Sequence, residues 1–150
     1  YLYIISDDGG NNSLQIADLS YLPDSAFVVY DSTDIFVHSH TLFIDGDKLY
    51  VGIVTTTTDV SSMNVYSLSN PVHPTLLRRL DQDYPSIGSV HDMYVIHDTV
   101  YASCGYDGLY IFRYDTLANQ FVLLGSLQDG FKNYNHSSFI SPDHPLIYLT

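Results

Sequence analysis

The feature that most constrains this chain is an internal repeat of about fifty residues. A tyrosine recurs inside an apolar run at intervals of 47, 51 and 47 residues, at Tyr3, Tyr50, Tyr101 and Tyr148. A histidine precedes the last three tyrosines by ten, ten and twelve residues, at His40, His91 and His136. An apolar run and an Asp-containing turn separate each histidine from its tyrosine. A fixed period of this length predicts a fold built from repeated supersecondary units.

Each unit reads as four short strands joined by tight turns. The His-to-Tyr segment contains two apolar runs, and two further runs follow, at 14–20 and 26–30, 63–69 and 75–80, and 109–115 and 121–127. These runs are rich in Val, Ile, Thr and Tyr, which favour strands over helices. Hairpin residues lie between runs, at Asp45-Gly46-Asp47, His97-Asp98 and Tyr106-Asp107-Gly108. The sequence therefore predicts an all-β chain of four-stranded antiparallel blades, a β-propeller. A sandwich or jelly roll predicts no such period.

The number of strands predicts an incomplete ring. Residues 1–37 supply about three strands, 38–89 and 90–135 supply a full blade each, and 136–150 supply two strands. The chain is thus expected to be part of a single propeller domain, 1–150, with two complete and two partial blades. Propellers close with 4–8 blades, so we expect this chain to belong to a larger ring. An abrupt strand-like start and end are consistent with targeting signals that lie on other segments.

The second run of the repeat resembles a known surface-protein motif. Leu14-Gln-Ile-Ala-Asp-Leu-Ser20 and Met63-Asn-Val-Tyr-Ser-Leu-Ser69 are similar to the LVIVD repeat, whereas the third copy departs from it at Arg113-Tyr-Asp115. The segment Asn135-His-Ser-Ser-Phe-Ile-Ser-Pro-Asp143 resembles the related choice-of-anchor B propeller proteins. This resemblance covers essentially the whole chain. It implies a secreted, bacterial-type propeller, extracellular, cell-surface or periplasmic, with no established activity.

The net charge of the chain limits the classes of partner that it is expected to bind. Seventeen acidic residues against five Lys and Arg give a formal net charge of −12, which repels the phosphate backbone of nucleic acids and anionic membrane surfaces. Cationic partners, divalent metals and neutral glycans remain compatible with it. No run is long and apolar enough for a transmembrane span. The single cysteine, Cys104, lies in an apolar stretch and is expected to be a small buried hydrophobic residue.

The aligned histidines are the first candidate site. Because equivalent positions of successive blades converge on the axis, His40, His91 and His136 are expected to lie at one mouth of the channel. One interpretation is a ring that binds a divalent metal or another ligand, with Asp92 or His38 as an extra ligand or as a group that orients a ligating histidine. The other is structural: each histidine hydrogen-bonds the backbone of a neighbouring blade and repeats because the blade repeats.

Two further groups of residues are weaker candidates. The loop that begins with Asp7 and Asp8 is rich in oxygen ligands suitable for calcium, but it lacks the ordered EF-hand pattern and reads more simply as a hairpin turn. The repeating tyrosines are expected to pack between blades. Tyr84, Tyr106 and Tyr134 lie in or near loops, where amphipathic rings suit a glycan- or protein-binding surface.

Two functions follow from these observations. No G-x-S-x-G nucleophile motif or phosphate-binding loop is present, so the first is a non-catalytic surface propeller that binds a protein or glycan. The alternative is a metal-dependent lyase or hydrolase with an axial histidine ring, suggested by analogy of fold with propeller enzymes that use axial metals.

Overall fold

The chain forms antiparallel sheets that follow one another in sequence order. The computed structural model describes residues 1–7, 13–128, 133–141 and 143–150. The first sheet contains β1 (Leu2–Ile5), β2 (Leu14–Asp18) and β3 (Phe27–Ser32). The second contains β4 (Thr41–Asp45), β5 (Lys48–Thr55), β6 (Val60–Ser67) and β7 (Thr75–Arg79), followed by a 3₁₀ turn, η1 (Leu80–Gln82).

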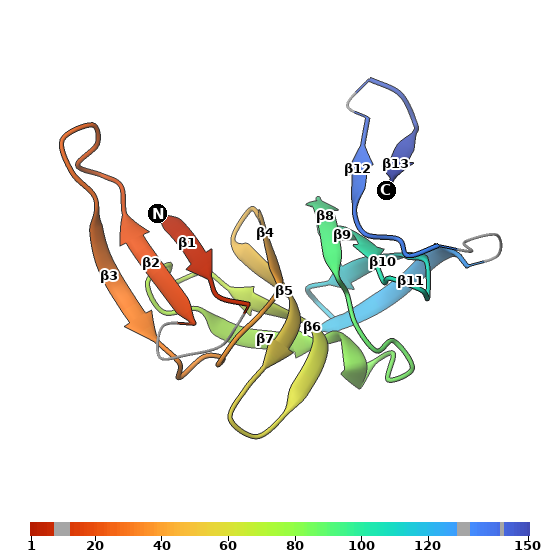
Figure 1. Cartoon of the computed structure of the whole chain (residues 1–150), viewed down its shortest axis with the longest axis horizontal. Helices are drawn as coiled ribbons and strands as arrows, with labels where there is room; N and C mark the ends of the chain where they lie inside the picture. Colours follow the sequence, from red (N-terminus) through yellow and green to blue (C-terminus); the bar gives the residue numbers. More distant parts are fainter. Residues whose placement is uncertain (8–12, 129–132, 142) are drawn as a thin grey trace.

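The remaining strands form a third and a fourth sheet (Figure 1). The third contains β8 (Asp92–Ile96), β9 (Thr99–Ser103), β10 (Leu109–Asp115) and β11 (Gln120–Leu127), and the fourth contains β12 (Ser138–Ile140) and β13 (Ile147–Leu149). In every sheet, strands adjacent in sequence are hydrogen-bonded neighbours. The predictions of an all-β chain and of four-stranded antiparallel sheets are confirmed. The described strands form an open row of sheets and no closed barrel (Figure 1).

The register of the strands repeats from sheet to sheet. The first strand of the last three sheets places an aromatic residue opposite the repeating tyrosine, in the pairs Phe43–Tyr50, Tyr94–Tyr101 and Phe139–Tyr148. A bulge recurs between the last two strands of each of the first three sheets, after Ile16, Val65 and Ile111. These three residues occupy the same place in the sequence repeat. Because a bulge bends a strand and increases its twist, the outer strand of each sheet deviates at the same point.

The predicted turns reverse the chain with backbone angles suited to their residues. Gly46 has φ +60°, and His97 and Asp98 have φ +49° and +59°. Two successive positive φ values fit the two-residue hairpin whose twist matches that of the flanking strands. These turns set the first strand of a sheet directly beside its second strand.

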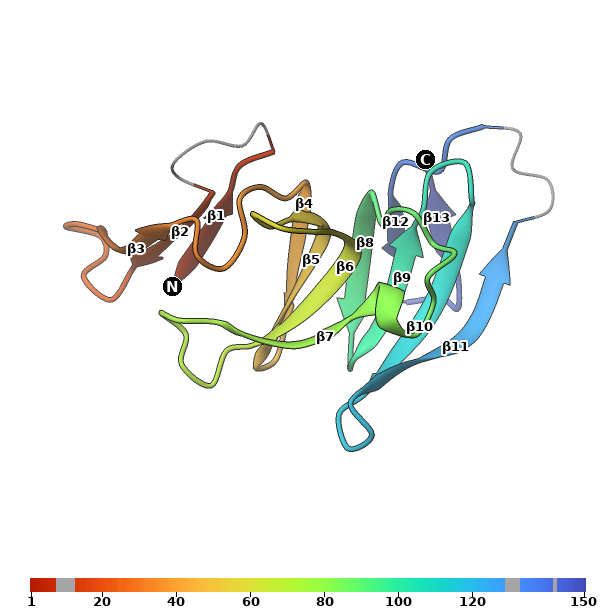
Figure 2. The ribbon, with the colours of Figure 1, turned by 90° about the horizontal axis from the view of Figure 1, so that it is seen from below.

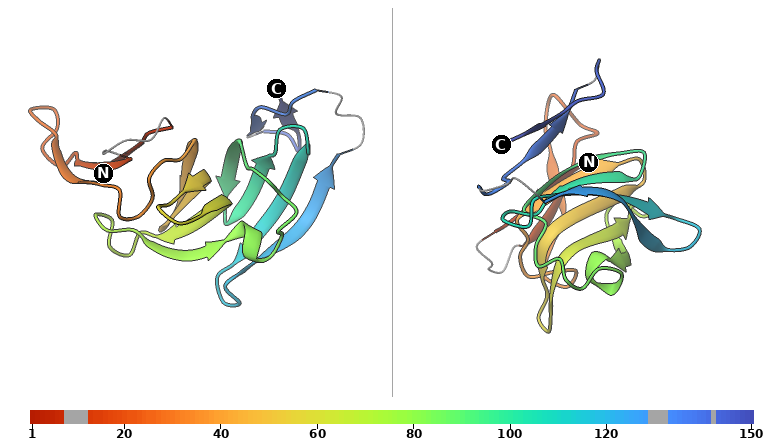
Figure 3. Two further views of the ribbon diagram at one scale, coloured as in Figure 1. Left: turned by 60° about the horizontal axis from the view of Figure 1, so that its bottom comes forward. Right: turned by 90° about the vertical axis from the view of Figure 1, so that its right-hand side faces the viewer.

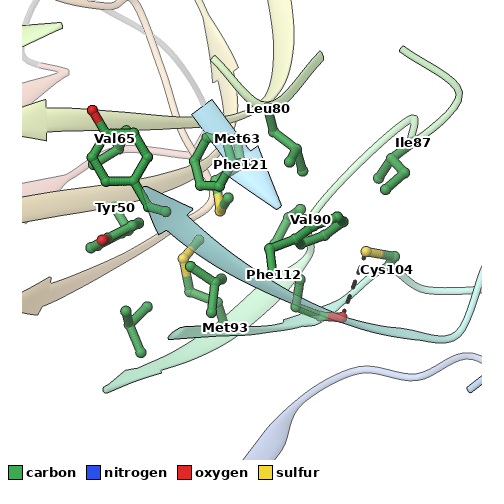
Figure 4. Packing of buried hydrophobic residues seen from close by; sticks show 14 residues of the cluster. Tyr50, Met63, Val65, Leu80, Ile87, Val90, Met93, Cys104, Phe112 and Phe121 are labelled. Carbon is green, nitrogen blue, oxygen red and sulfur yellow. Dashed lines mark hydrogen bonds between the residues drawn. The ribbon is translucent and has the colours of Figure 1, made fainter. Parts of the chain in front are cut away.

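The hydrophobic core lies between successive sheets. Alternate residues of β5 face opposite neighbours: Leu49 and Val51 pack toward the first sheet, whereas Tyr50 packs toward the third. The larger cluster, between the second and third sheets, includes Met63 and Phe112, both fully buried (Figure 4). Burying a side chain of this size contributes about 1.5–3 kcal/mol. The sheets are therefore held face to face by their side chains.

The first strands of the last three sheets lie side by side. β8 contacts both β4 and β12, and in Figure 2 the three strands follow one another along the molecule in the order β4, β8, β12. Thr41 Oγ1 donates a hydrogen bond of 3.0 Å to Asp92 Oδ1, between β4 and β8. The rings of Phe43, Tyr94 and Phe139 form a row with centroid separations of 5.2 and 5.4 Å. Because these three strands are neighbours, the residues just before β4, β8 and β12 lie close together.

A polar network joins the turns of the second and third sheets. Tyr50 OH donates to Asp98 Oδ1 at 2.8 Å, and Lys48 Nζ lies 3.2 Å from the same oxygen. The backbone N–H of Asp98 in turn donates to Asp45 Oδ2 at 2.7 Å. The predicted packing of Tyr50 between sheets is confirmed.

Large apolar side chains are exposed at both ends of the row of sheets. Leu2 and Ile4 lie on the face of β1 turned away from the second sheet, and Phe139 and Tyr148 lie on the two-stranded fourth sheet. Figure 3 shows these sheets at opposite ends of the molecule. Tyr148 is 57% exposed, so among the described residues its predicted packing between sheets is not seen.

Candidate ligand-binding surface

Three histidines form a column of contacting rings, which we call the histidine column: His40, His91 and His136. The ring centroids of His40 and His91 are 4.3 Å apart, and those of His91 and His136 are 4.4 Å apart. Each histidine lies immediately before β4 or β8, or two residues before β12. The sequence repeat therefore brings together rings that are 51 and 45 residues apart in the chain.

The backbone fixes the position of each histidine. The N–H groups of His40, His91 and His136 donate to the carbonyl oxygens of Gly52, Ser103 and Thr150, at 3.0, 2.8 and 2.6 Å. The residue before each histidine is fully buried and donates its own N–H to the preceding sheet, at Ser39, Val90 and Asn135. The rings thus project from rigid strand ends.

The histidine column carries different partners along its length. Asp7 Oδ2 lies 2.9 Å from His40 Nδ1, and His91 Nδ1 lies 3.1 Å from the carbonyl oxygen of His136. Desolvation lowers the pKa of His91, and the charges of the His40 and His136 rings act in the same direction, whereas the contact with the His136 carbonyl oxygen and the charge of Asp92 oppose them without reversing the shift. His91 is therefore stabilised as a neutral imidazole in the middle of the column, with a contact to neighbouring backbone of the kind that the structural interpretation describes.

The other two predicted metal ligands, Asp92 and His38, have other contacts. Asp92 Oδ1 accepts the hydrogen bond from Thr41 Oγ1 described above. His38 forms an isolated bridge with Thr55, and its buried Nδ1 has no hydrogen-bond partner among the described residues. Within residues 1–7, 13–128, 133–141 and 143–150, no group of three or more His, Cys, Asp or Glu side chains is arranged to hold a metal ion. Metal binding by the histidines stays a prediction.

The predicted calcium loop lies partly outside the described residues. Asp8 belongs to the segment 8–12, which the structure does not describe. Asp7 is described, exposed and paired with His40. Calcium binding there also stays a prediction.

Two tyrosines extend the histidine column sideways, and we call them the tyrosine pair: Tyr106 and Tyr134. Tyr134 packs edge-on against His91 at 5.2 Å, and Tyr106 packs edge-on against Tyr134 at 5.1 Å. Tyr106 is 80% exposed and Tyr134 is 38% exposed. By contrast, Tyr84 packs against the core residue Phe112 at 5.0 Å and accepts a hydrogen bond from the N–H of Leu123. Two of the three loop tyrosines therefore share one surface.

Glycine makes room for Tyr134. Gly105 has φ +61°, and a β-carbon built there would lie 2.7 Å from the Tyr134 ring. A backbone bridge between Gly105 and Asn135 holds the segment next to Tyr134 against the third sheet. Only a residue without a side chain permits both the backbone angle and the close approach. The sequence repeat gave no sign of this contact.

A concavity lies beside β6 and β7 of the second sheet, next to the connection between β3 and β4. It has a volume of about 340 Å³ and a mixed polar and apolar lining that includes Asp34, Asp59, Asn64, His73 and Arg79. Its polar groups are largely paired with one another, since Arg79 contacts Asp59 and the carboxamide of Asn64 donates to Tyr66 OH at 2.9 Å. The lining comes from two strands, β6 and β7, and from three connections, so no local sequence pattern indicated this concavity.

Comparison with known proteins adds no family to these observations. No protein-family model, curated protein or solved structure matches this chain. Among the described residues, no helix has the length and apolar character needed to cross a lipid bilayer.

Proposed function

We propose that this chain is part of an extracellular or cell-surface β-propeller of the LVIVD or choice-of-anchor B type, and that it is a non-catalytic binding module. Its ligand, a glycan or a protein segment, contacts the histidine column and the tyrosine pair. The observation that carries the proposal is the exposed Tyr106 ring, joined through Tyr134 to the histidines. Aromatic rings left in water at the end of a rigid framework are typical of recognition surfaces.

The propeller part of the proposal is supported by the repeated geometry. Each described sheet is an up-and-down meander, and β4, β8 and β12 lie side by side at equivalent positions. In a propeller, one rotation axis beside the histidine column relates all sheets. A crystal structure should give the same rotation from the first sheet to the second as from the second to the third. Unequal rotations, or axes that diverge, would contradict a propeller.

Charge restricts the ligand to two classes. At a net charge of −12, a neutral glycan or a basic protein segment is favoured over an anionic ligand. Sugar rings stack their C–H faces on tyrosine with little dependence on salt, whereas a basic segment is attracted by the acidic surface and is screened by salt. Titration at low and at high ionic strength therefore separates the two classes.

The binding test compares two exposed tyrosines at different places. Tyr106→Ala should weaken binding of the best ligand from a panel of neutral glycans and basic peptides by about five- to thirtyfold, because each aromatic contact contributes about 1–2 kcal/mol. Tyr21→Ala is the matched control, since Tyr21 is 59% exposed and packs edge-on against Phe27 in the first sheet. Calorimetry measures both affinities. Equal loss in the two variants would contradict a ligand at the tyrosine pair.

A metal-dependent lyase or hydrolase is the second candidate, and the contact between the three imidazoles favours it. On this proposal the column binds a divalent metal such as zinc through its ring nitrogens. Protein purified without chelators should retain metal by elemental analysis, and His91→Ala should lose it. His73→Ala is the control, because His73 lies outside the column beside Tyr30. Retention of metal in His91→Ala, or no metal in the unmodified protein, would contradict this candidate.

A further inference from the structure

The concavity beside β6 and β7 corresponds to a filled space at the next interface between sheets. Val65 of β6 and Ile111 of β10 are equivalent, because each pairs with the repeating tyrosine of its sheet and precedes the bulge. The residues on either side of them are therefore also equivalent: Asn64 and Tyr66 in β6, Tyr110 and Phe112 in β10. In β10 both are aromatic, and their stacked rings lie 5.9 Å apart in the packing between the second and third sheets. In β6 a carboxamide takes the place of one ring, and a cavity of about 340 Å³ remains.

The concavity is formed within the row of sheets. Three connections contribute to its lining, β3–β4, β5–β6 and β6–β7, and each of them joins two described strands. Tyr66 also belongs to the cluster packed between the first and second sheets, where its ring lies 6.1 Å from that of Phe36. The histidine column lies beside β4, at the other edge of the second sheet from β7. The concavity is therefore separate from the candidate surface described above.

The buried part of the lining is a row of polar side chains on β6: Ser61, Asn64 and Tyr66. Ser61 Oγ donates to Asn64 Oδ1 at 2.7 Å, and Asn64 Nδ2 donates to Tyr66 OH at 2.9 Å. Burial raises the pKa of Tyr66, so its hydroxyl keeps its proton at neutral pH. Among the described residues, no side chain or backbone carbonyl accepts that proton in a hydrogen bond. The row therefore ends in a buried donor that needs an acceptor.

The positive charge in the lining is already paired. Arg79 donates through Nε and Nη2 to the carboxylate of Asp81 and through Nη1 to that of Asp59. An anionic ligand would have to displace one of these carboxylates, in a chain whose net charge is −12. The lining therefore disfavours phosphate, sulfate and carboxylate ligands.

The exposed part of the lining offers acceptors and apolar contacts. A side-chain hydrogen bond from Ser32 lowers the pKa of Asp34, and one from Arg79 lowers the pKa of Asp59, so both are carboxylates at neutral pH. Apolar side chains complete the lining: Ile35, Pro74 and Leu76. A matching ligand donates hydrogen bonds to carboxylates, accepts one from Tyr66 and presents an apolar face. A ring that carries hydroxyl groups meets all three requirements, whereas an alkyl amine has no acceptor.

We propose that this concavity binds a neutral monosaccharide, free or as a residue of a glycan, with one oxygen that accepts from Tyr66 and hydroxyl groups that donate to Asp34 and Asp59. A hydroxyl group both donates and accepts, as this lining requires. A volume of about 340 Å³ lies in the range of small-molecule pockets. The site is independent of the ligand proposed for the histidine column and the tyrosine pair, so either can fail without the other.

The test titrates the isotope-labelled chain with a panel of neutral hexoses, pentoses and N-acetylhexosamines. The best of these sugars should shift the side-chain amide resonances of Asn64 and the Nε–H resonance of Arg79. Shifts confined to the histidine column, or no shift with any sugar, would overturn the proposal. Inorganic phosphate or an alkyl diamine that shifts these resonances, when no sugar does, would also overturn it.

The methyl glycoside of the best sugar distinguishes the two sources of the ligand. Affinity equal to that of the free sugar supports a residue of a glycan, because the anomeric oxygen is then free to carry the next residue. Loss of affinity supports a free monosaccharide whose anomeric hydroxyl is bound.

Two variants test the assigned contacts. Tyr66→Phe removes the hydroxyl group and should weaken binding of the sugar by about two- to twelvefold, the range for a hydrogen bond between neutral groups. Tyr114→Phe is the matched control, since Tyr114 is also 3% exposed and its hydroxyl donates to Asn119 in the third sheet. Its affinity should equal that of the unmodified protein. Equal affinity in Tyr66→Phe would overturn the assigned donor.

A variant that fills the concavity tests the site without disturbing the buried row. Leu76 is 52% exposed, so Leu76→Trp should leave the circular dichroism spectrum unchanged. Its larger ring should occupy the concavity and abolish the shifts caused by the sugar. Sugar binding that survives in Leu76→Trp would place the ligand elsewhere and overturn the proposal.

Discussion

The interface between the second and third sheets is closed, whereas the interface between the third and fourth sheets is open, although both begin in the same way. The inner contacts are nearly equal: Phe43–Tyr94 and Tyr94–Phe139 are separated by 5.2 and 5.4 Å. Beyond them, the closed interface continues into a large buried cluster around Tyr50 and Phe112. The open interface instead contains a cavity of about 310 Å³ beside Tyr101.

This difference indicates that the inner strand and the outer strands of a sheet have different structural roles. The inner strand sets the position of a sheet relative to its neighbour, since one short strand, β12, suffices to continue the aromatic row and the histidine column. The outer strands supply the buried area. The fourth sheet has two strands, so Leu124 and Leu127 of β11 stay about half exposed. Stability is therefore concentrated between the second and third sheets, and surface chemistry is concentrated along the inner strands.

The largest expected effect comes from truncating equivalent tyrosines on either side of this divide. Tyr50→Ala removes a fully buried ring and its hydrogen bond to Asp98 and should lower the free energy of unfolding by about 3–5 kcal/mol. Tyr148→Ala removes a ring that is 57% exposed and should cost under about 1 kcal/mol. Urea unfolding followed by circular dichroism measures both. Similar losses in the two variants would show that the fourth sheet is packed as tightly as the second.

The buried cysteine reports on the same closed interface. Cys104 is 2% exposed, and burial raises the pKa of its thiol to about 12, so a thiol reagent at pH 8 reaches it only when the structure opens. If Tyr50→Ala lowers stability by 3 kcal/mol, labelling should become about a hundredfold faster. Tyr148→Ala should leave the rate unchanged. Fast labelling of the unmodified protein would contradict a closed interface, and urea-unfolded protein supplies the upper limit.

Much of this fold could be predicted from the sequence, because each copy of the repeat contains the same order of strands and turns. The period located the strands, the turns at Gly46 and at His97-Asp98, and the alignment of the three histidines. What the repeat does not encode is the difference between copies. Tyr50 and Tyr148 hold equivalent positions, but residues of the next sheet bury Tyr50, whereas Tyr148 stays 57% exposed.

The candidate surface shows the same limit. The histidine column follows from the repeat, but its partners Asp7, Tyr134 and Gly105 lie in the connections, where the copies differ in length and composition. A ring that packs on a glycine 29 residues away leaves no periodic signal. The polar concavity beside Asn64 leaves no periodic signal either, because its lining combines β6 and β7 with three separate connections.

A smaller effect is expected from the polar network that spans the closed interface. Asp98→Asn keeps a residue that tolerates φ +59° but removes the charge opposite Lys48, whose side chain is 11% exposed. Stability should fall by about 1 kcal/mol. Asp47→Asn is the control, since Asp47 contacts the same Lys48 Nζ at 3.1 Å but is 75% exposed, and should change stability little. Equal effects would mean that the network adds nothing beyond a surface ion pair.

The smallest expected effect lies in the histidine column, which both interfaces share. Because desolvation lowers the pKa of His91 in the folded chain, the neutral ring contributes stability above its ordinary pKa of about 6.5. That contribution is lost as the pH falls through the lowered pKa. The urea midpoint should therefore drop between pH 7.5 and pH 5.5, and the drop should be smaller in His91→Gln, which cannot titrate.

His73→Gln is the control for this titration, because its ring lies beside Tyr30, away from the column. It should keep the pH dependence of the unmodified protein. Asp7 beside His40 and Asp92 beside His91 are present in all three proteins, so the difference between the variants isolates the His91 ring. If the urea midpoint of His91→Gln falls with pH as steeply as that of the unmodified protein, protonation of His91 does not destabilise the folded chain, as expected for a solvent-exposed ring. The inner strands would then position the sheets without burying the rings between them.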